Sequence, residues 1–346
     1  MAQHPLSTAR VKSFGPFTSL DLEFSPGLNV VIGENGAGKS QLIKLLYSTT
    51  KVLSDRQGER PTKGNLNSAI ARKLVGVFRP EALGRLTNRQ QGRTRCEVSV
   101  EYRGMTPLAF GFATNSSAEV RTETVPDQFL TETPAFIPTR ELLSIYPGLV
   151  GIFDERALDL EETWRDTALL LARPVRRGPK EAVIRSVLEP ISRALGGRIV
   201  EDGGRFYLVQ AGLGNLEMHL VAEGFRKLGM IVRLVSSGVL LEGGYLFWDE
   251  PETNLNPKTL GDVAKTIVEL SNSGVQVFVA THSIFLLREI ELLTSGIDAR
   301  PPTFIGLHRR PDSTVSAEFG ATISDVGDIA ALDAEFAQSH RYLELP

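Results

Sequence analysis

The feature that most constrains this sequence is a glycine-rich loop set between a predicted strand and a predicted helix. The apolar, β-branched residues 28–32 (Leu-Asn-Val-Val-Ile) predict a buried strand. Residues 33–40 then read Gly-Glu-Asn-Gly-Ala-Gly-Lys-Ser, and residues 41–47 have the apolar periodicity of a helix. A Gly-x-x-x-x-Gly-Lys-Ser loop in this setting is the pattern of a phosphate-binding loop, and it predicts an α/β fold built around that loop.

The residue types in this loop suit an anion. Glycine adopts positive φ without a Cβ clash, so Gly33, Gly36 and Gly38 let the backbone curl around a phosphate. The loop N–H groups and the start of the helix then direct partial positive charge at it. We expect Lys39 to reach the β- and γ-phosphates and the Ser40 hydroxyl to ligate Mg²⁺. The predicted nucleotide contacts in this segment are Gly33, Glu34, Asn35, Gly36, Ala37, Gly38, Lys39, Ser40 and Gln41.

A second predicted strand narrows the chemistry, because the loop alone fits kinases, GTPases and motor ATPases. The apolar residues 245–248 end in the sequence Asp-Glu-Pro-Glu at 249–252. An aspartate at such a strand end can hold Mg²⁺, and the adjacent glutamate can act as general base toward the attacking water. Asp249 is therefore a predicted metal ligand and Glu250 a predicted catalytic residue. The alternative is that both belong to a solvated strand end or a helix cap.

A histidine follows a third apolar strand. His282 lies 33 residues after Asp249, just past a strand predicted over residues 275–280. A lone histidine is more often an ordinary surface or core residue. This one lies at the carboxyl end of a buried strand, where α/β sheets bind their ligands. We expect it to sense the γ-phosphate and orient the lytic water, which completes a predicted catalytic set of Lys39, Glu250 and His282.

Together, the loop 33–40 and the segments 249–251 and 281–283 (Thr-His-Ser) resemble an ABC-type ATPase. Residues 10–17 and 252–257 resemble the branch that contains the structural-maintenance-of-chromosomes (SMC) heads and the OLD-type (overcoming lysogenisation defect) ATPases. This branch includes the AAA-family ATPases of bacterial anti-phage defence systems such as the Septu, retron and PARIS types. The resemblance is clear over residues 7–50 and 215–295. It implies an α/β P-loop NTPase head of ABC type with a mixed β-sheet, and ATP and Mg²⁺ as cofactors.

The resemblance also implies that two heads sandwich two ATP molecules in a homodimer or higher oligomer. Each site is then completed by a signature loop of the opposite subunit. The matching segment here is 221–227, which opens a helix predicted to run through Leu234. Glu223 and Gly224 are its predicted nucleotide contacts, since a helix N-terminus suits an incoming phosphate. Ala222 stands where the family has serine, which removes a hydroxyl donor and implies slow hydrolysis. An ordinary amphipathic helix start is the alternative.

Two further family loops have weaker matches. Residues 254–257 (Asn-Leu-Asn-Pro) are implied to lie where paired subunits communicate. The family's Gln loop follows a central strand, and its best match is the segment 135–141. No glutamine occurs there, so Arg140 and Glu141 are its candidate substitutes.

The spacing of these segments predicts a divided domain. Residues 1–50 and 215–346 are the expected ATPase core, and residues 51–214 are the expected compact α+β insertion between the phosphate loop and the signature segment. Within the insertion we expect a basic segment at 51–95, a β segment at 95–140 and a helical segment at 157–195. The Asp-Gly-Gly sequence at 202–204 predicts a β-hairpin.

The overall charge hides an uneven distribution. The chain has 38 basic and 41 acidic side chains, yet the segment 51–95, from Lys51 to Arg95, contains eleven basic and three acidic residues. Such a block suits nucleic acid or another acidic partner, although a solvated surface is an equally good interpretation. Cys96 is the only cysteine, which excludes an internal disulfide and a Cys-based metal site. The absence of long apolar stretches predicts a cytoplasmic protein without direct membrane insertion.

The sequence is therefore interpreted as an ATP-binding and hydrolysing head that dimerises on ATP. The resemblance favours a regulatory subunit of an anti-phage defence system. A separate nuclease or toxin would be its effector, because the 64 residues after His282 are too few for the nuclease domain of OLD-type enzymes. The alternative is a DNA-repair or chromosome-maintenance ATPase that acts directly on DNA. A transporter ATPase subunit fits less well, and a module that only binds ATP stays open.

Overall fold

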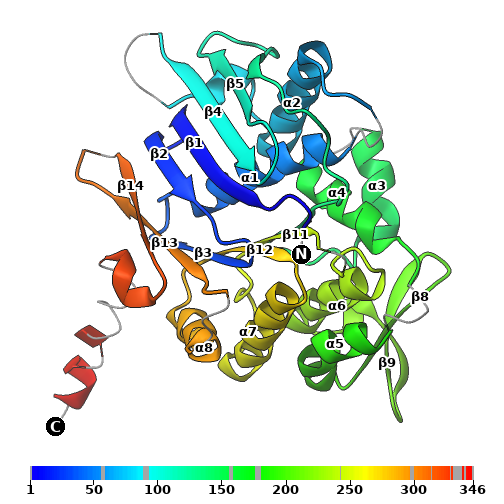
Figure 1. The fold of residues 1–346 in the computed structure, drawn as a ribbon. Helices are drawn as coiled ribbons and strands as arrows, with labels where there is room; N and C mark the ends of the chain where they lie inside the picture. Colours follow the sequence, from blue (N-terminus) through cyan, green and yellow to red (C-terminus); the bar gives the residue numbers. More distant parts are fainter. Residues whose placement is uncertain are drawn as a thin grey trace.

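The structure of the protein is a computed structural model. It describes residues 2–55, 59–88, 93–155, 159–175, 181–241, 243–296, 300–312 and 314–327, together with 329, 337–338 and 340–344. Figure 1 shows a central β-sheet, with a second sheet and several helices on one side and a further group of helices on the other.

The central sheet is mixed. Its strand order is β14 (Val315–Gly320), β13 (Thr303–Arg309), β3 (Leu28–Gly33), β12 (Gln276–Thr281), β11 (Tyr245–Asp249) and β7 (Ala135–Ile137). β13, β3, β12, β11 and β7 run parallel, and β14 pairs antiparallel with β13. The strands predicted at 28–32, 245–248 and 275–280 are confirmed, and they are neighbours in the sheet.

The second sheet is antiparallel and combines segments that are distant in the sequence. Its order is β2 (Phe17–Glu23), β1 (Leu6–Phe14), β4 (Arg95–Tyr102), β5 (Leu108–Ala113) and β6 (Arg121–Thr124). The register aligns Val11 of β1 with Val98 of β4. The predicted insertion is therefore not a separate body: its β4–β6 complete a sheet begun by β1 and β2, while its β7 joins the central sheet. The predicted division missed this because strand pairing depends on contacts that local patterns do not encode.

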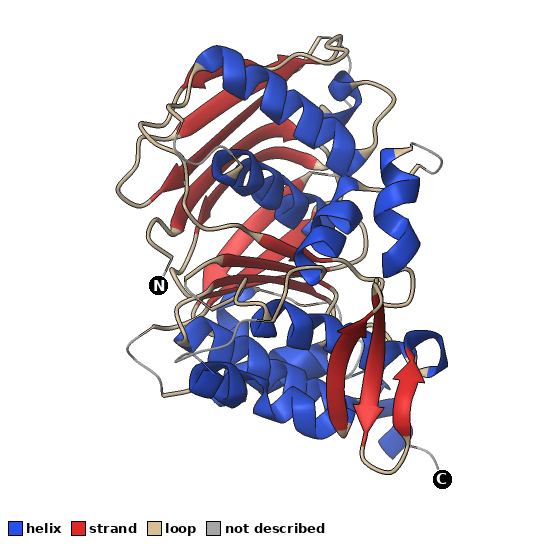
Figure 2. Cartoon of the chain, turned by 90° about the vertical axis from the view of Figure 1, so that its right-hand side faces the viewer, coloured by secondary structure: helices blue, strands red, loops and turns tan. Residues whose placement is uncertain are grey.

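The helices cover both faces of the central sheet (Figure 2). α1 (Lys39–Ser54) and α2 (Lys63–Phe78) lie toward the antiparallel sheet, with α3 (Tyr146–Asp154) and α4 (Glu162–Leu171) beside them. α5 (Glu181–Leu195), α6 (Glu223–Ser236), α7 (Pro257–Asn272) and α8 (Ile284–Thr294) cover the opposite face. A small sheet of β8 (Gly197–Asp202), β9 (Arg205–Gln210) and β10 (Gly214–Glu217) lies beside α5 and α6 and contains the predicted hairpin. Residues 176–180, within the predicted helical segment, lie outside the described residues.

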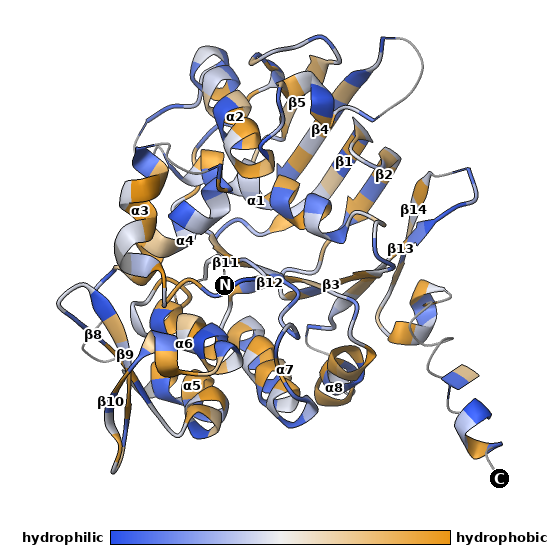
Figure 3. Cartoon of the chain, turned by 180° about the vertical axis from the view of Figure 1, so that it is seen from behind, coloured by the Kyte–Doolittle hydropathy of each residue, from blue (hydrophilic) through white to orange (hydrophobic). Residues whose placement is uncertain are grey.

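Two hydrophobic cores lie on the two faces of the central sheet. Figure 3 colours the strands and helices that contribute to them by hydropathy. In β11, Leu246 and Trp248 belong to the core shared with α5–α8, whereas Tyr245 and Phe247 belong to the core shared with α1 and the antiparallel sheet. This alternation follows from the period of two in a strand. It places Asp249, two residues after Phe247, on the face toward α1.

The basic segment 51–95 does not present eleven unpaired cations. Of its basic side chains that the structure describes, five form ion pairs, namely Lys51–Asp55, Lys73–Glu162 and Lys73–Asp166, Arg79–Asp159, Arg85–Glu81 and Arg95–Glu123. Arg56 and Arg89 lie outside the described residues. The pairing reduces the net positive charge that this segment offers to a polyanion. Within the part of the chain that the structure describes, no helix combines the length and the apolar character needed to cross a membrane.

Candidate nucleotide-binding and hydrolysis site

The glycine-rich loop lies at the carboxyl end of β3 and leads directly into α1. Gly38 has φ of 94°, and a Cβ there would come within 2.6 Å of Phe17 and Pro16 in the β1–β2 hairpin. Glycine is required at this position for both reasons. Gly38 also caps α1 with no side-chain hydrogen bond, so the first N–H groups of the helix carry no side-chain cap. Such a helix start suits a phosphate.

The side chain of Lys39, the first residue of α1, reaches back into the loop that precedes the helix. Its Nζ donates hydrogen bonds to the carbonyl oxygens of Gly33 (2.7 Å) and Glu34 (3.1 Å). Burial lowers the pKa of Lys39, whereas the carboxylates of Glu250, Glu252 and Asp249 act in the opposite direction. The ammonium therefore lies between the carbonyl groups of the loop and the carboxylates at the end of β11.

Ser40 and Asp249 form the candidate metal site. The Ser40 hydroxyl donates to Oδ1 of Asp249 at 2.9 Å, although the two residues are 209 positions apart. Burial raises the pKa of Asp249 to about 6, against the hydrogen bond from Ser40 and the charge of Lys44. A hydroxyl beside a buried carboxylate at the edge of a phosphate loop is the oxygen donor set that Mg²⁺ prefers with a nucleotide. The residues present therefore fit Mg²⁺-ATP.

Glu250 follows Asp249 in a left-handed backbone conformation with φ of 46°. Its N–H donates to the Ala280 carbonyl (2.9 Å), and its own carbonyl accepts from the Thr253 hydroxyl (3.0 Å). The carboxylate lies beside His282, with 3.5 Å between Oε1 and the ring Nδ1. Both side chains are partly exposed, so they can meet a ligand and a water. Positive φ in a non-glycine residue costs free energy and concentrates at functional sites.

A second carboxylate, Glu252, holds the end of β12. Its Oε1 accepts hydrogen bonds from the Thr281 hydroxyl (2.7 Å) and the His282 backbone N–H (3.0 Å), and it lies 3.3 Å from His282 Nδ1. These contacts orient His282 so that Nδ1 faces the carboxylates and Nε2 is left for a ligand. Glu252 lies in the 249–252 segment that the sequence singles out, but its positioning role was not predicted.

The predicted signature segment begins α6. Ala222 is the N-cap residue and makes no side-chain cap hydrogen bond, and Glu223 and Gly224 are the first two helical residues. Gly224 is buried against the loop after β11, because a Cβ there would come within 2.6 Å of the Asn254 carbonyl oxygen. The start of α6 is thus packed on the 254–257 loop of its own chain.

The structure separates the two candidate Gln-loop substitutes. Glu141 is buried and forms an ion pair with Arg226 Nε at 3.0 Å, which ties the segment after β7 to the start of α6. Arg140 is exposed. Gln41, a predicted nucleotide contact, lies against Gly15 in the β1–β2 hairpin, since a Cβ on Gly15 would come within 2.0 Å of its Oε1.

A buried lysine adjoins this site from α6. Lys227 is 1% exposed, and its Nζ donates to the main-chain carbonyl of Glu250 at 2.6 Å. Lys227 lies within the predicted signature segment, but no role was predicted for it. Its spacing gave a signal: it lies three residues after Gly224 and four before Ile231, on the buried stripe of the helix.

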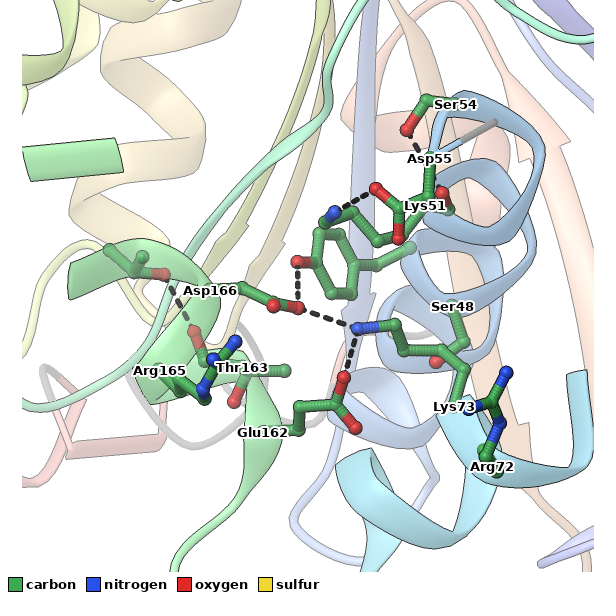
Figure 4. A network of polar contacts seen from close by, with 12 residues as sticks. Ser48, Lys51, Ser54, Asp55, Arg72, Lys73, Glu162, Thr163, Arg165 and Asp166 are labelled. Atoms are coloured by element: carbon green, nitrogen blue, oxygen red, sulfur yellow. Dashed lines mark hydrogen bonds and ion pairs between the residues drawn. The ribbon is translucent and has the colours of Figure 1, made fainter. Parts of the chain in front are cut away.

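A polar network anchors α1 behind the site (Figure 4). Lys73 of α2 donates to Glu162 (2.5 Å) and Asp166 (2.8 Å) of α4, and the Tyr47 hydroxyl of α1 donates to Asp166 (2.6 Å). Lys44, one turn after Ser40, pairs with Glu161 at 2.6 Å. The helix that carries Lys39 and Ser40 is therefore fixed by charged groups from α2 and α4.

Comparison with known families gives a match over most of the chain. The model of the family described as "AAA domain, putative AbiEii toxin, Type IV TA system" matches residues 28–288. The DNA replication and repair proteins RecF of Aliivibrio fischeri (strain MJ11) and of Actinobacillus pleuropneumoniae (serotype 5b, strain L20) are 42% identical over 43 residues, 12% of this chain. The chain spans 12% of the length of these curated relatives.

Solved structures resemble the whole fold. An SMC head bound to the C-winged helix domain of ScpA has a TM-score of 0.56 and 14% identity, covering 92% of this chain and 98% of that chain. An SMC head with an extended coiled coil, bound to the C-terminal domain of ScpA derived from Pyrococcus furiosus, has a TM-score of 0.53 and 13% identity, covering 98% and 100%. These similarities confirm the predicted fold class, an ABC-type P-loop ATPase head with a mixed sheet.

Proposed function

The chain belongs to the AAA-domain family just described, and from that premise we propose that it binds Mg²⁺-ATP and hydrolyses it to ADP and phosphate. The observation that carries the proposal is the convergence at one sheet edge. The Ser40–Asp249 pair lies beside Lys39, and Glu250 and His282 lie side by side at the ends of β11 and β12. Oxygen ligands, a phosphate-binding cation and a base with its neighbouring imidazole are the parts that phosphoryl transfer to water requires.

Each residue has a distinct task in this reaction. The loop N–H groups and Lys39 bind the β- and γ-phosphates. Ser40 and Asp249 hold Mg²⁺, which neutralises charge on the phosphate oxygens when bound. Glu250 takes a proton from the attacking water, and His282, held by Glu252, orients that water and contacts the γ-phosphate. The left-handed backbone of Glu250 directs its carboxylate toward His282.

The same proposal includes an ATP-linked dimer. The start of α6 lacks a side-chain cap, and its first residues, Glu223 and Gly224, are predicted to meet the nucleotide bound by a second copy. Because Ala222 provides no hydroxyl, we expect slow turnover. The ion pair between Arg226 and the buried Glu141 supports the position of this helix start.

The experiment that tests hydrolysis compares wild-type protein with Glu250→Gln. We expect kcat to fall by roughly 10²-fold or more, as loss of a general base does, while ATP still binds. Glu269→Gln, an exposed carboxylate on α7, is the matched control and should keep full activity. Equal ATPase rates for wild-type protein and Glu250→Gln would refute Glu250 as the base. Size-exclusion chromatography of Glu250→Gln with ATP tests the dimer, which should form with ATP and dissociate with EDTA.

A finer proposal concerns the biological role. We propose a regulatory ATPase whose effector, a nuclease or toxin, is a separate polypeptide in an anti-phage defence system. The family description, which names a putative toxin of a Type IV TA system, supports a link to toxicity. Co-purification of the tagged chain from its native host should recover an effector whose toxicity changes in Glu250→Gln. If Glu250→Gln controls the toxicity of the effector as fully as the wild-type protein does, a role for ATP binding without turnover would be favoured instead.

The second candidate is an ATPase that acts directly on DNA, and the RecF similarity favours it. The basic segment 51–95 is its candidate contact, although five of its cations are already paired. Duplex DNA should then stimulate the ATPase of the purified protein alone. Reversal of the exposed Arg60, Lys63 and Arg72 to glutamate should abolish that stimulation and leave basal turnover intact. No stimulation at low salt would reject this candidate.

A further inference from the structure

Lys227 is a buried cation that the proposed reaction does not use. It lies on α6 among apolar side chains of the core, beside the buried Leu228 and one turn before Ile231. The described contacts give its ammonium one hydrogen bond, to the Glu250 carbonyl oxygen at 2.6 Å. A lysine this buried costs stability unless it is compensated. A methionine would fill similar volume on this stripe at less cost, so packing alone does not account for a lysine here.

The charges that most affect the pKa of Lys227 belong to the reaction site or to the start of its own helix. Burial is the largest influence and lowers the pKa of Lys227 to about 8. The carboxylates of Glu252, Glu250 and Asp249 at the end of β11, and of Glu223 on α6, act in the opposite direction. Lys227 thus lies near the carboxylates at the end of β11 and contacts the main chain of Glu250.

The main chain at Glu250 needs such support because its conformation is strained. A φ of 46° is unfavourable for a residue that has a Cβ. Four hydrogen bonds oppose relaxation: the Glu250 N–H donates to Ala280, and the Glu250 carbonyl accepts from the Thr253 N–H (3.2 Å), the Thr253 hydroxyl and Lys227. The Lys227 bond is the shortest of the four and the charged one, and charge-assisted hydrogen bonds are the stronger class.

We propose that Lys227 is a positioning residue for ATP hydrolysis. Its ammonium holds the Glu250 carbonyl, and with it the left-handed turn that carries the Glu250 carboxylate to the attacking water beside His282. Lys227 touches neither nucleotide nor water and acts through Glu250. The inference rests on the proposed ATPase function and deepens it, because it explains why the base lies in a strained conformation.

The chain offers a matched control on the same helix. Arg233 of α6 is also a buried cation that donates to main-chain carbonyls, those of Leu171 and Arg173, each at 3.0 Å. Those carbonyls lie at the end of α4, away from the sheet edge. Arg233→Met therefore removes the same kind of contact from the same helix without touching Glu250.

The experiment measures ATPase kinetics, affinity for a fluorescent ATP analogue and urea unfolding for wild type, Lys227→Met, Lys227→Arg and Arg233→Met. In Lys227→Met we expect kcat to fall roughly 10- to 100-fold, the usual cost of a misplaced catalytic group, with analogue affinity and KM within about twofold. Lys227→Arg, which keeps a cationic donor, should recover part of the rate, and Arg233→Met should keep kcat. In a Glu250→Gln background, Lys227→Met should cause no further loss, because both act through one group.

The possible failures are distinguishable. If wild-type protein hydrolyses no ATP, the proposed function fails and this inference falls with it. If wild type is active and Lys227→Met has the same kcat, or if Arg233→Met loses as much, the positioning role alone is overturned. A fall in analogue affinity equal to the fall in kcat would also overturn it, since that places Lys227 in nucleotide binding. Lys227→Gln carries the same comparison if the methionine variant does not fold.

Discussion

Two buried lysines lie on opposite sides of the central sheet and meet different surroundings. Lys73 on α2 is 6% exposed and donates to two carboxylates, Glu162 and Asp166. Burial lowers its pKa, but those carboxylates outweigh burial and the pKa is raised. Lys227 on α6 is 1% exposed and bonds to a neutral carbonyl, and burial lowers its pKa to about 8.

The difference separates a region that stabilises the fold from one that is organised for chemistry. Around Lys73, opposite charges are paired in place and fix α1, α2 and α4. At the sheet edge, burial disfavours the charged forms of Lys39, Lys227 and Asp249, so their pKa values move toward neutrality. Perturbed groups clustered in this way are typical of functional sites, which commonly reduce stability.

The largest effect should come from breaking the paired region. Lys73→Met leaves the buried Asp166, and the partly exposed Glu162 beside it, without their cation, and an unpaired buried charge typically costs about 3–5 kcal/mol. Urea unfolding should show this loss in the free energy of unfolding. Lys63→Met, an exposed lysine on the same helix, is the control and should stay within about 0.5 kcal/mol. A Lys73→Met midpoint close to wild type would show that the network contributes little.

At the sheet edge, removing a charge should raise the free energy of unfolding instead of lowering it. Asp249→Asn removes a buried carboxylate whose pKa is raised from 3.8 to about 6, a difference of about 3 kcal/mol at 1.36 kcal/mol per unit. Because the folded protein binds this proton more readily than the unfolded chain, the gain should be full above pH 6 and should disappear as the pH falls toward 4. Thermal unfolding without Mg²⁺ at pH 7.5 and 4.5 measures it. A variant less stable than wild type at pH 7.5 would contradict this account.

Local sequence patterns predicted the strands and the loop at this edge, but not which charged side chains are buried behind them. The strand at 28–32, the loop and the strands ending at Asp249 and Thr281 follow from apolar runs and residue spacing, and the structure places them side by side. The Ser40–Asp249 hydrogen bond follows because parallel neighbouring strands end at one edge. The roles of Lys227 and Glu252 were missed, since whether a charged side chain is buried depends on which element packs over it.

The same reason explains the missed sheet pairing. β1 and β4 both alternate in burial, but only β4 lies in a predicted β segment, and nothing in either sequence states that Val11 lies opposite Val98. The predicted insertion boundary at residue 51 therefore fell between segments that share a core. The Lys73 network was missed likewise, because its acidic partners lie 89 and 93 residues away.

Lys227→Met tests the difference between the two buried lysines most directly, because the same substitution is made at Lys73. Removing an ammonium whose pKa is lowered from 10.5 to about 8 should stabilise the protein by roughly 1–3 kcal/mol at pH 7, less the lost hydrogen bond. The gain should shrink as the pH rises from 8 to 10.5, where the folded wild type loses this proton before the unfolded chain does. Urea unfolding at pH 7 and 10 tests the sign. Destabilisation as large as in Lys73→Met would erase the distinction between the two lysines.

The smallest effect tests whether the two regions are independent. Tyr47 belongs to the helix that begins with Lys39, but its hydroxyl serves Asp166 in the paired region. Because Asp166 keeps Lys73, Tyr47→Phe should cost only about 1 kcal/mol in unfolding. Tyr102→Phe, which removes a neutral hydrogen bond to Thr50 of the same helix, is the matched control and should cost no more. If the network around Lys73 and Asp166 only stabilises the fold, neither variant should change kcat by more than about twofold at a temperature where both are folded. A selective fall in kcat for Tyr47→Phe would mean that the network also sets the position of the phosphate loop, since α1 is the element that the two regions share.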